Sequence, residues 1–152
     1  MPSIVEASEQ FQINAPREKC WKFFESLTQI GFCIPGCESV TPIDDRTANF
    51  KVKLRVGYLS RTFELKVRLK EVRAPSHLSF VGEGSDAEIL GIVDMFPLEG
   101  DNSVRVTYKL EIKAASVIGK TAIGMIGKDL VRKQATQFAS CVRSKLEAVE
   151  PN

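Results

Sequence analysis

Residues 48–58 and 61–72 both alternate between apolar side chains and side chains that are mostly charged. A repeat of two residues indicates a β-strand, because successive side chains point to opposite faces of a sheet. One face of both segments is rich in lysine, arginine and glutamate, so we expect that face to be in water. Such alternation is typical of an antiparallel sheet with one covered face. The apolar face comprises Phe50, Val52, Leu54, Val56 and Tyr58 in the first segment, and Phe63, Leu65, Val67 and Leu69 in the second.

Five further segments are predicted to be strands, which gives seven strands in all. Short connections rich in Asp, Asn, Gly and Pro separate most of them, and such turns favour antiparallel neighbours over crossovers. We therefore expect an antiparallel sheet in which consecutive strands pair. The five further segments are residues 4–13, 37–43, 77–84, 87–98 and 103–113.

The covered face of residues 87–98 stays ambiguous. A bulge near Asp94 would turn Phe96 and Leu98 inward, because a bulge shifts the parity of the residues that follow it. The two competing sets are Ile89, Val93 and Met95 on one parity, and Leu90, Ile92 and Phe96 on the other.

Helical patterns occur in two places. After the first strand, Pro16 is typical of the first turn of a helix, and a second short helix is expected over residues 27–32, ending at the turn Ile34-Pro35-Gly36. From residue 117 to residue 149 the apolar period becomes 3.6, which predicts one long amphipathic helix packed on the inner face of the sheet. Its apolar stripe comprises Ile123, Gly127, Leu130, Val131, Gln134, Phe138, Cys141 and Val142.

Composition limits the class of protein. The chain has 152 residues, of which 43% are apolar, and this fits a single domain spanning residues 1–152. A formal charge of +2, spread along the strands, does not favour nucleic acid as a partner. No apolar run is long enough for a transmembrane anchor, and the N-terminus does not resemble a signal peptide, so we expect a cytoplasmic protein.

The cysteines and the single histidine do not form a motif for metal binding or nucleophilic catalysis. We expect reduced, mostly buried thiols, because cytosolic cysteines usually stay reduced. A regulatory redox pair of Cys33 and Cys37 is an alternative, although their spacing is not the redox motif. His77 lacks a second histidine or a serine-centred motif, and the sequence offers no glycine-rich loop between a strand and a helix. We expect no metal and no cofactor.

The order of elements and several local motifs resemble the CoxG family, the G subunit of carbon monoxide dehydrogenase, within the START and polyketide cyclase-like (SRPBCC) superfamily. The resemblance implies an α+β helix-grip fold, in which a seven-stranded antiparallel sheet wraps around a long C-terminal helix and two short helices lie between strands 1 and 2. The motifs that carry it are Phe11 through Trp21 with Ala15-Pro16, Ile34-Pro35-Gly36, Val56-Gly57, Gly82-Glu83-Gly84, Thr107-Tyr108, and Gly119 to Gly127 followed by Phe138.

The family resemblance implies a binding protein rather than a defined enzyme. It implies a cavity between sheet and helix for an apolar small molecule such as a quinone or lipid, and an association with a molybdenum hydroxylase of the carbon monoxide dehydrogenase type. It brings no catalytic residue set. Many members have a C-terminal extension thought to reach the membrane, and this chain ends at Asn152 just after the helix.

Four inward polar groups leave the chemistry of the cavity open. They could orient the polar head of an apolar ligand, or Glu9 and Tyr108 could act as a general acid-base pair, since burial raises the pKa of a carboxyl. Alternatively, Tyr58 lies at a strand end with its hydroxyl in water and Glu9 lies at a bulge or faces the open end. The four groups are Glu9, Tyr58, Tyr108 and Gln134.

Three functions remain open. The leading one is a carrier for an apolar ligand; the others are a cyclase or hydrolase of aromatic polyketide-like substrates, and a docking subunit without a ligand. Gly124 and Gly127 either leave room over the sheet for a ligand or for a movable first turn, or pack closely on the sheet, and the apolar residues around them suit transient contact with a membrane or a partner. The residues expected to bind the ligand are Phe24, Ile34, Pro35, Phe50, Leu54, Tyr58, Phe63, Leu65, Phe80, Met95, Tyr108, Ile123, Gly127, Leu130, Gln134 and Phe138.

Overall fold

A computed structural model describes residues 4–56, 58–98, 100, 102–125 and 128–147. Seven strands form one antiparallel sheet in the order β1-β7-β6-β5-β4-β3-β2, so consecutive strands pair from β2 to β7 and β1 closes on β7. This confirms the predicted sheet. The strands are β1 (Ile4–Ile13), β2 (Cys37–Asp44), β3 (Thr47–Val56), β4 (Leu59–Arg73), β5 (His77–Glu83), β6 (Ala87–Pro97) and β7 (Val104–Ala114).

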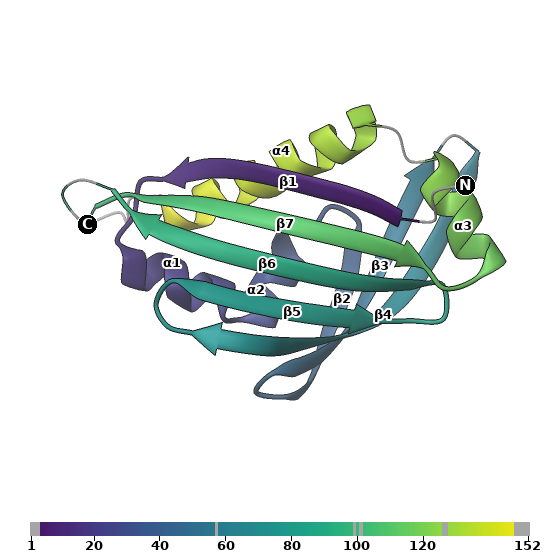
Figure 1. Ribbon diagram of the computed structural model, residues 1–152, viewed down its shortest axis with the longest axis horizontal. Coiled ribbons are helices and arrows are strands. Elements are labelled where there is room, and N and C mark those ends of the chain that lie inside the picture. The colour runs from purple at the N-terminus through teal and green to yellow at the C-terminus, as the bar shows by residue number, and fades with distance from the viewer. Residues whose placement is uncertain (1–3, 57, 99, 101, 126–127, 148–152) are drawn as a thin grey trace.

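Helices α1 (Arg17–Phe24) and α2 (Leu27–Cys33) connect β1 to β2, and α3 (Val117–Met125) and α4 (Lys128–Leu146) follow β7. The sheet is strongly curved, and α1, α2 and α4 lie on its concave side, as the helix-grip prediction requires, whereas α3 lies at one end of the sheet (Figure 1). No helix in the described part of the chain is long and apolar enough to span a membrane.

The face of β6 that the sequence left open is now assigned. Val93 and Met95 are buried, whereas Leu90 and Phe96 are exposed on the convex face. The pairing of β6 with β5 and with β7 runs without a register shift, so the bulge considered near Asp94 does not form. Without a bulge the alternation continues through Met95, which therefore points to the core, and the next residue, Phe96, faces water.

The two short helices seal one end of the core. Pro16 caps α1 with extended backbone, and the Ser26 side chain caps α2 by accepting a hydrogen bond from the Gln29 N–H at 3.3 Å. The inward sides of both helices are fully buried, together with the adjoining ends of the strands. The buried residues of the two helices are Cys20, Trp21, Phe23, Phe24, Leu27, Ile30, Gly31 and Cys33.

The prediction of one continuous helix from residue 117 to residue 149 is wrong. The structure has two helices, α3 and α4, which point in different directions (Figure 1). The contacts that hold α3 in its own direction are at its start, where Ser116 ties the first turn to the loop between β5 and β6. The Ser116 hydroxyl donates to Asp86 Oδ1 at 2.7 Å and accepts from the Gly119 N–H at 2.9 Å. Gly119 also packs directly on the Asp86 carbonyl, which leaves no room for a Cβ.

A disulfide bond joins Cys33 of α2 to Cys141 of α4. The prediction of four reduced thiols is therefore wrong for this pair, and the Cys33–Cys37 alternative is wrong as well. The two partners lie 108 residues apart in sequence, so spacing could not reveal them. Cys20 and Cys37 are free. A second contact joins the same helices, because the Lys145 ammonium lies 3.7 Å from the centre of the Phe32 ring.

Candidate functional site

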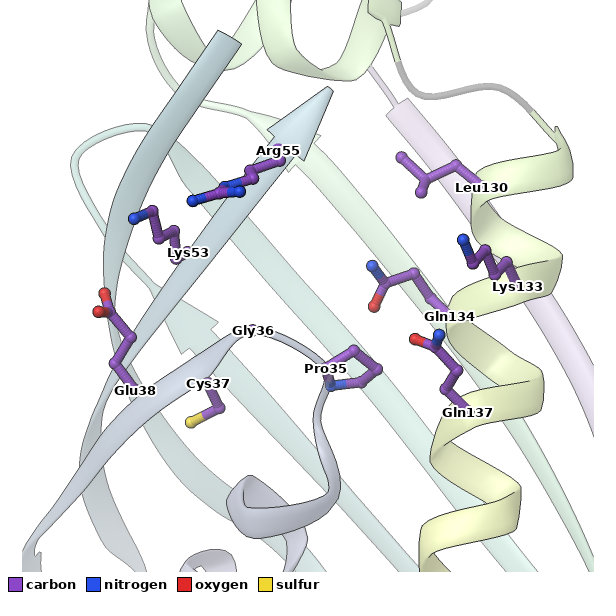
Figure 2. Close-up of a pocket in the computed structure, with 10 residues that line it drawn as sticks. All are labelled: Pro35, Gly36, Cys37, Glu38, Lys53, Arg55, Leu130, Lys133, Gln134 and Gln137. Carbon is purple, nitrogen blue, oxygen red and sulfur yellow. The ribbon is translucent and has the colours of Figure 1, made fainter. Parts of the chain in front are cut away.

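A cleft of about 500 Å³ opens between α4, the end of β3 and the turn that precedes β2. Side chains from one side of α4 project across it toward Pro35 and β3 (Figure 2). It is lined by Pro35, Gly36, Cys37, Glu38, Lys53, Arg55, Leu130, Lys133, Gln134 and Gln137.

The turn at Gly36 creates the cleft by ending the pairing of β2 with β3. Gly36 has a φ of 85°, a conformation that favours glycine, and a Cβ there would collide with the Lys53 carbonyl. The Lys53 N–H donates to the Gly36 carbonyl at 2.7 Å, and β2 pairs with β3 only as far as Val52. Beyond this point β3 has no neighbouring strand on the side of β2, and the space beside it becomes the cleft.

The inner face of the sheet is well covered at one end and poorly covered near the cleft. On β7, Val104 and Val106 are fully buried, whereas Tyr108 is half-buried. On β3, Phe50 is buried and Leu54 is half-buried. The same gradient occurs along β1, β4 and α4: Phe11, Ile13, Val67, Leu69, Ala139, Val142 and Leu146 are buried, whereas Val5, Ala7, Phe63, Leu130 and Val131 are half-buried.

This gradient means that apolar surface on the concave side stays partly open to solvent. A well-packed core would remove it from water, since burying an apolar side chain stabilises a fold by about 1.5–3 kcal/mol. Half-buried apolar side chains beside the cleft include Leu54, Phe63, Tyr108 and Leu130, and we refer to this partly covered part of the concave side as the chamber.

Cationic side chains dominate the rim of the cleft. Lys53 and Arg55 come from β3 and Lys133 comes from α4, while Glu38 is the one carboxylate among the lining residues. The Thr62 hydroxyl donates to Glu38 Oε1 at 3.2 Å, which partly satisfies this carboxylate. In the described part of the chain, no ion pair involves any of the three cations.

Cys37 places a thiol at the mouth of the cleft. It is partly exposed, and burial raises the pKa of its thiol, so the thiolate is scarce at neutral pH. The other free cysteine, Cys20, is fully buried, and burial raises the pKa of its thiol to about 11. A thiol reagent should therefore reach Cys37 and not Cys20.

Glu9 and Tyr108 are cross-strand partners on the inner face. The Tyr108 ring makes edge-on contacts with Phe11 and Phe138, with ring centres 6.3 Å and 6.0 Å apart. Burial, with a smaller contribution from the Glu9 charge, raises the pKa of the Tyr108 hydroxyl to about 12. A hydroxyl with this pKa stays protonated at neutral pH, where it can donate a hydrogen bond but is a poor general acid or base.

Three of the sixteen residues expected to bind a ligand line the cleft: Pro35, Leu130 and Gln134. Six are half-buried on the concave side, namely Ile34, Leu54, Phe63, Phe80, Tyr108 and Phe138, and five are core residues, namely Phe24, Phe50, Leu65, Met95 and Ile123. Gly127 lies outside the described residues.

The predicted inward position of Tyr58 is wrong, because the side chain is fully exposed in the turn between β3 and β4. The regular pairing of β3 with β4 ends at Val56 and Leu59, so the alternation stops before Tyr58. The alternative that its hydroxyl lies in water is correct. Glu9 and Gln134 are half-buried, as expected for inward polar groups, but only Gln134 lines the cleft.

The charged part of the site could not be found from the sequence pattern. Lys53 and Arg55 occupy the solvent parity of β3, and Lys133 lies on the polar side of α4. They reach the cleft only because β2 leaves β3 at Gly36. The one available signal is the Pro35-Gly36 turn, which interrupts the chain just before β2. In the described part of the chain, no group of three or more potential metal ligands comes together.

The curved sheet and the long helix on its concave side define a helix-grip fold. The family model described as the G subunit of carbon monoxide dehydrogenase (CoxG) matches residues 10–147, so the chain belongs to that family. None of the curated proteins compared with the chain matches it.

Several solved structures have the same fold. A conserved protein from Geobacillus kaustophilus superposes with a TM-score of 0.73 at 15% identity, covering 94% of this chain and 95% of its own. A START superfamily protein from Mycobacterium smegmatis gives 0.69 at 11% identity, covering 93% and 97%. The Zhui aromatase/cyclase of a Streptomyces species gives 0.66 at 10% identity, covering 95% and 94%. At these identities the likeness concerns the fold alone.

Proposed function

We propose that the protein binds an apolar small molecule of the quinone or lipid type in the chamber between the sheet and α4, and acts as its carrier. The observation that carries the proposal is the loss of cover along the inner face toward a cleft of about 500 Å³. Sites for small molecules typically measure about 300–1,000 Å³ and combine apolar walls with a few polar groups. The half-buried side chains next to the cleft supply such walls.

Contact with a membrane would let the carrier exchange its ligand. Of the nine large hydrophobic side chains exposed among the described residues, five lie at one end of the molecule, where α3, the β3–β4 hairpin and the start of β1 meet (Figure 1). The described residues of segments 55–61 and 113–125 include Arg55, Arg61, Lys113 and Lys120, and Arg61 pairs with Asp86 of the adjoining β5–β6 loop at 3.9 Å. Apolar and basic side chains together suit an anionic lipid surface. The five side chains are Ile4, Tyr58, Val117, Ile118 and Met125.

Membership of the CoxG family suggests the recipient of the ligand. We infer that the carrier serves a molybdenum-containing enzyme of the carbon monoxide dehydrogenase type, on the basis of family membership alone. A pull-down of such an enzyme that depends on the loaded carrier would support this partner, and equal capture by the empty carrier would indicate docking without a ligand.

Native mass spectrometry with added ubiquinone-1 tests the proposed function. The wild-type protein should bind one quinone, and Leu130→Arg, which fills the cleft, should abolish binding. The control Leu90→Arg changes an exposed leucine on the convex face and should bind normally. An absence of binding to wild-type protein, or equal binding by Leu130→Arg, would contradict a chamber entered through this cleft.

A cyclase acting on aromatic polyketide-like substrates is the competing function. The neighbouring positions of Glu9 and Tyr108 favour it, and a structurally similar protein is an aromatase/cyclase. A cyclase would need these groups and Gln134 to converge on one substrate, but Glu9 and Tyr108 do not line the cleft that Gln134 lines. The carrier function requires no such convergence, so we prefer it.

A further inference from the structure

The rim of the cleft has a charge that a neutral ligand would not need. Lys53 and Arg55 of β3 and Lys133 of α4 line the cleft from opposite walls, and the Lys53 and Arg55 side chains are directed away from α4, on the side of Glu38 (Figure 2). The Lys53 backbone is held by its hydrogen bond to Gly36, so this side of the rim has a fixed position. Three cations against one carboxylate give the rim an excess of positive charge.

The neighbouring amides add hydrogen-bond donors to the same opening. Gln134 and Gln137 project from α4 toward the turn at Pro35 (Figure 2). An amide group can donate two hydrogen bonds, and hydrogen bonds between cationic donors and an anionic acceptor are stronger than neutral ones. Glu38 accepts the Thr62 hydroxyl at 3.2 Å and keeps its single negative charge, which the three cations outnumber.

The apolar wall begins directly behind this rim. Leu130 lines the cleft one helical turn before Gln134, and Leu54 lies between Lys53 and Arg55 on the opposite face of β3. A ligand with a charged head and an apolar tail could therefore keep its head among the cations while its tail enters the chamber. A head that stays at the rim also avoids the cost of burying a charge.

We propose that the preferred ligand is an anionic amphiphile, whose carboxylate or phosphate head binds beside Lys53 and Arg55 at the rim, while Lys133 on the opposite wall adds to the positive charge there. The inference rests on the proposed function and specifies the ligand class of the same site. The tail supplies most of the affinity through apolar burial, and the rim selects the head.

Displacement of the neutral dye Nile red from the chamber measures this preference. Decanoate, decyl phosphate and 1-decanol share one hydrocarbon chain and differ in the head, and the measurement is made at a pH where the carboxyl is ionised. We expect decanoate to bind on the order of tenfold more tightly than 1-decanol, with the difference shrinking as salt is added. The affinity of decyl phosphate relative to that of decanoate then shows which of the two anionic heads binds more tightly.

Single variants identify the groups responsible. Lys53→Gln, Arg55→Gln and Lys133→Gln should each weaken the binding of decanoate more than the binding of 1-decanol, and so reduce the preference for decanoate. Lys51→Gln is the matched control: it lies on the same strand and parity as Lys53, but pairs with Glu64 at 3.6 Å and does not line the cleft. Glu38→Gln should increase the affinity for decanoate, a gain that loss of folding cannot imitate.

The results of these experiments distinguish a failure of the proposed anionic head from a failure of the proposed carrier function. Equal binding of decanoate and 1-decanol, unchanged in the lysine and arginine variants, would overturn the anionic head and leave the carrier function intact. Failure of Nile red and of all three chains to bind would overturn both. A preference for decanoate that Lys51→Gln removes as strongly as Lys53→Gln would also overturn the inference, because general surface charge would then explain it.

Discussion

The two tyrosines of this protein show how position decides the behaviour of one side chain. Tyr108 lies between two phenylalanine rings on the inner face, whereas Tyr58 is exposed at a hairpin turn. Both follow an apolar alternation in the sequence, so the alternation predicted an inward position for both. Only Tyr108 has strand pairing on both sides to hold it there.

Titration of Tyr108 tests this environment. In a Tyr58→Phe background the absorbance of tyrosinate reports Tyr108 alone, and the midpoint should lie near pH 12 instead of the ordinary 10. Burial is the main cause, so Glu9→Gln should lower the midpoint only partly. The unfolded chain releases this proton near pH 10 while the folded protein keeps it to about 12, so the free energy of unfolding should fall across that range. A midpoint near 10 in the folded protein would contradict the inner position.

The sequence could predict single residues only where a regular pattern continued on both sides. Met95 was one of two possibilities until the continuous register of β6 settled it. Lys53 and Arg55 were assigned to the wet face correctly, but their place at the cleft depends on the point where β2 leaves β3. That point is a tertiary feature, set by the approach of Gly36 to the Lys53 carbonyl.

Helix α3 contains two glycines in opposite surroundings. A Cβ at Gly119 would collide with the Asp86 carbonyl, whereas a Cβ at Gly124 would meet no atom within 4 Å. Gly119→Ala should therefore lower the free energy of unfolding by roughly 1–3 kcal/mol, because α3 must shift off the β5–β6 loop. Gly124→Ala, the matched control, should raise it by about 0.5–1 kcal/mol through helix propensity. Urea unfolding measures the free energy of unfolding of both variants. Equal effects of the two substitutions would contradict the packing of α3 against Asp86.

The disulfide bond between Cys33 of α2 and Cys141 of α4 should stabilise the covered end of the protein. The Cys33–Cys141 disulfide spans 108 residues, and closing so long a loop restricts the unfolded chain strongly. Changing both cysteines to serine should lower the free energy of unfolding by about 2–5 kcal/mol.

The test of the disulfide compares unfolding with and without reductant. The wild-type protein should lose stability when reduced, the double variant should not respond to reductant, and Cys37→Ser should behave like wild type. Labelling of all four cysteines in unfolded, unreduced protein would show that the bond does not form.

The elements themselves could be predicted well because each has a strong local pattern. All seven predicted strands end within two residues of the observed ends, and the first helix after β1 begins after the expected proline. The break between α3 and α4 could not be predicted from periodicity, since apolar residues continue on both sides of it. The direction of α3 depends on the contacts of Ser116 and Gly119 with a loop that is distant in the sequence.

The whole molecule is asymmetric, with a sealed end at α1 and α2 and an apolar, basic end at α3. If the α3 end contacts membranes, wild-type protein should float with vesicles that contain phosphatidylglycerol, and added salt should weaken the association. Val117→Glu and Met125→Glu should abolish flotation, whereas Leu90→Glu, on the convex face, should not. Flotation that is equally strong in all three variants would assign the contact to another surface.

The central claim is that a ligand occupies the cleft beside α4, and Cys37 offers the most direct test of it. A fluorescent maleimide should label this thiol and spare the buried Cys20 and the disulfide-bonded pair. We predict that ubiquinone-1 or decanoate slows the labelling of Cys37 in proportion to its binding, and that Leu130→Arg removes this protection. Binding of either compound without any change in the labelling rate of Cys37 would contradict a ligand in the cleft.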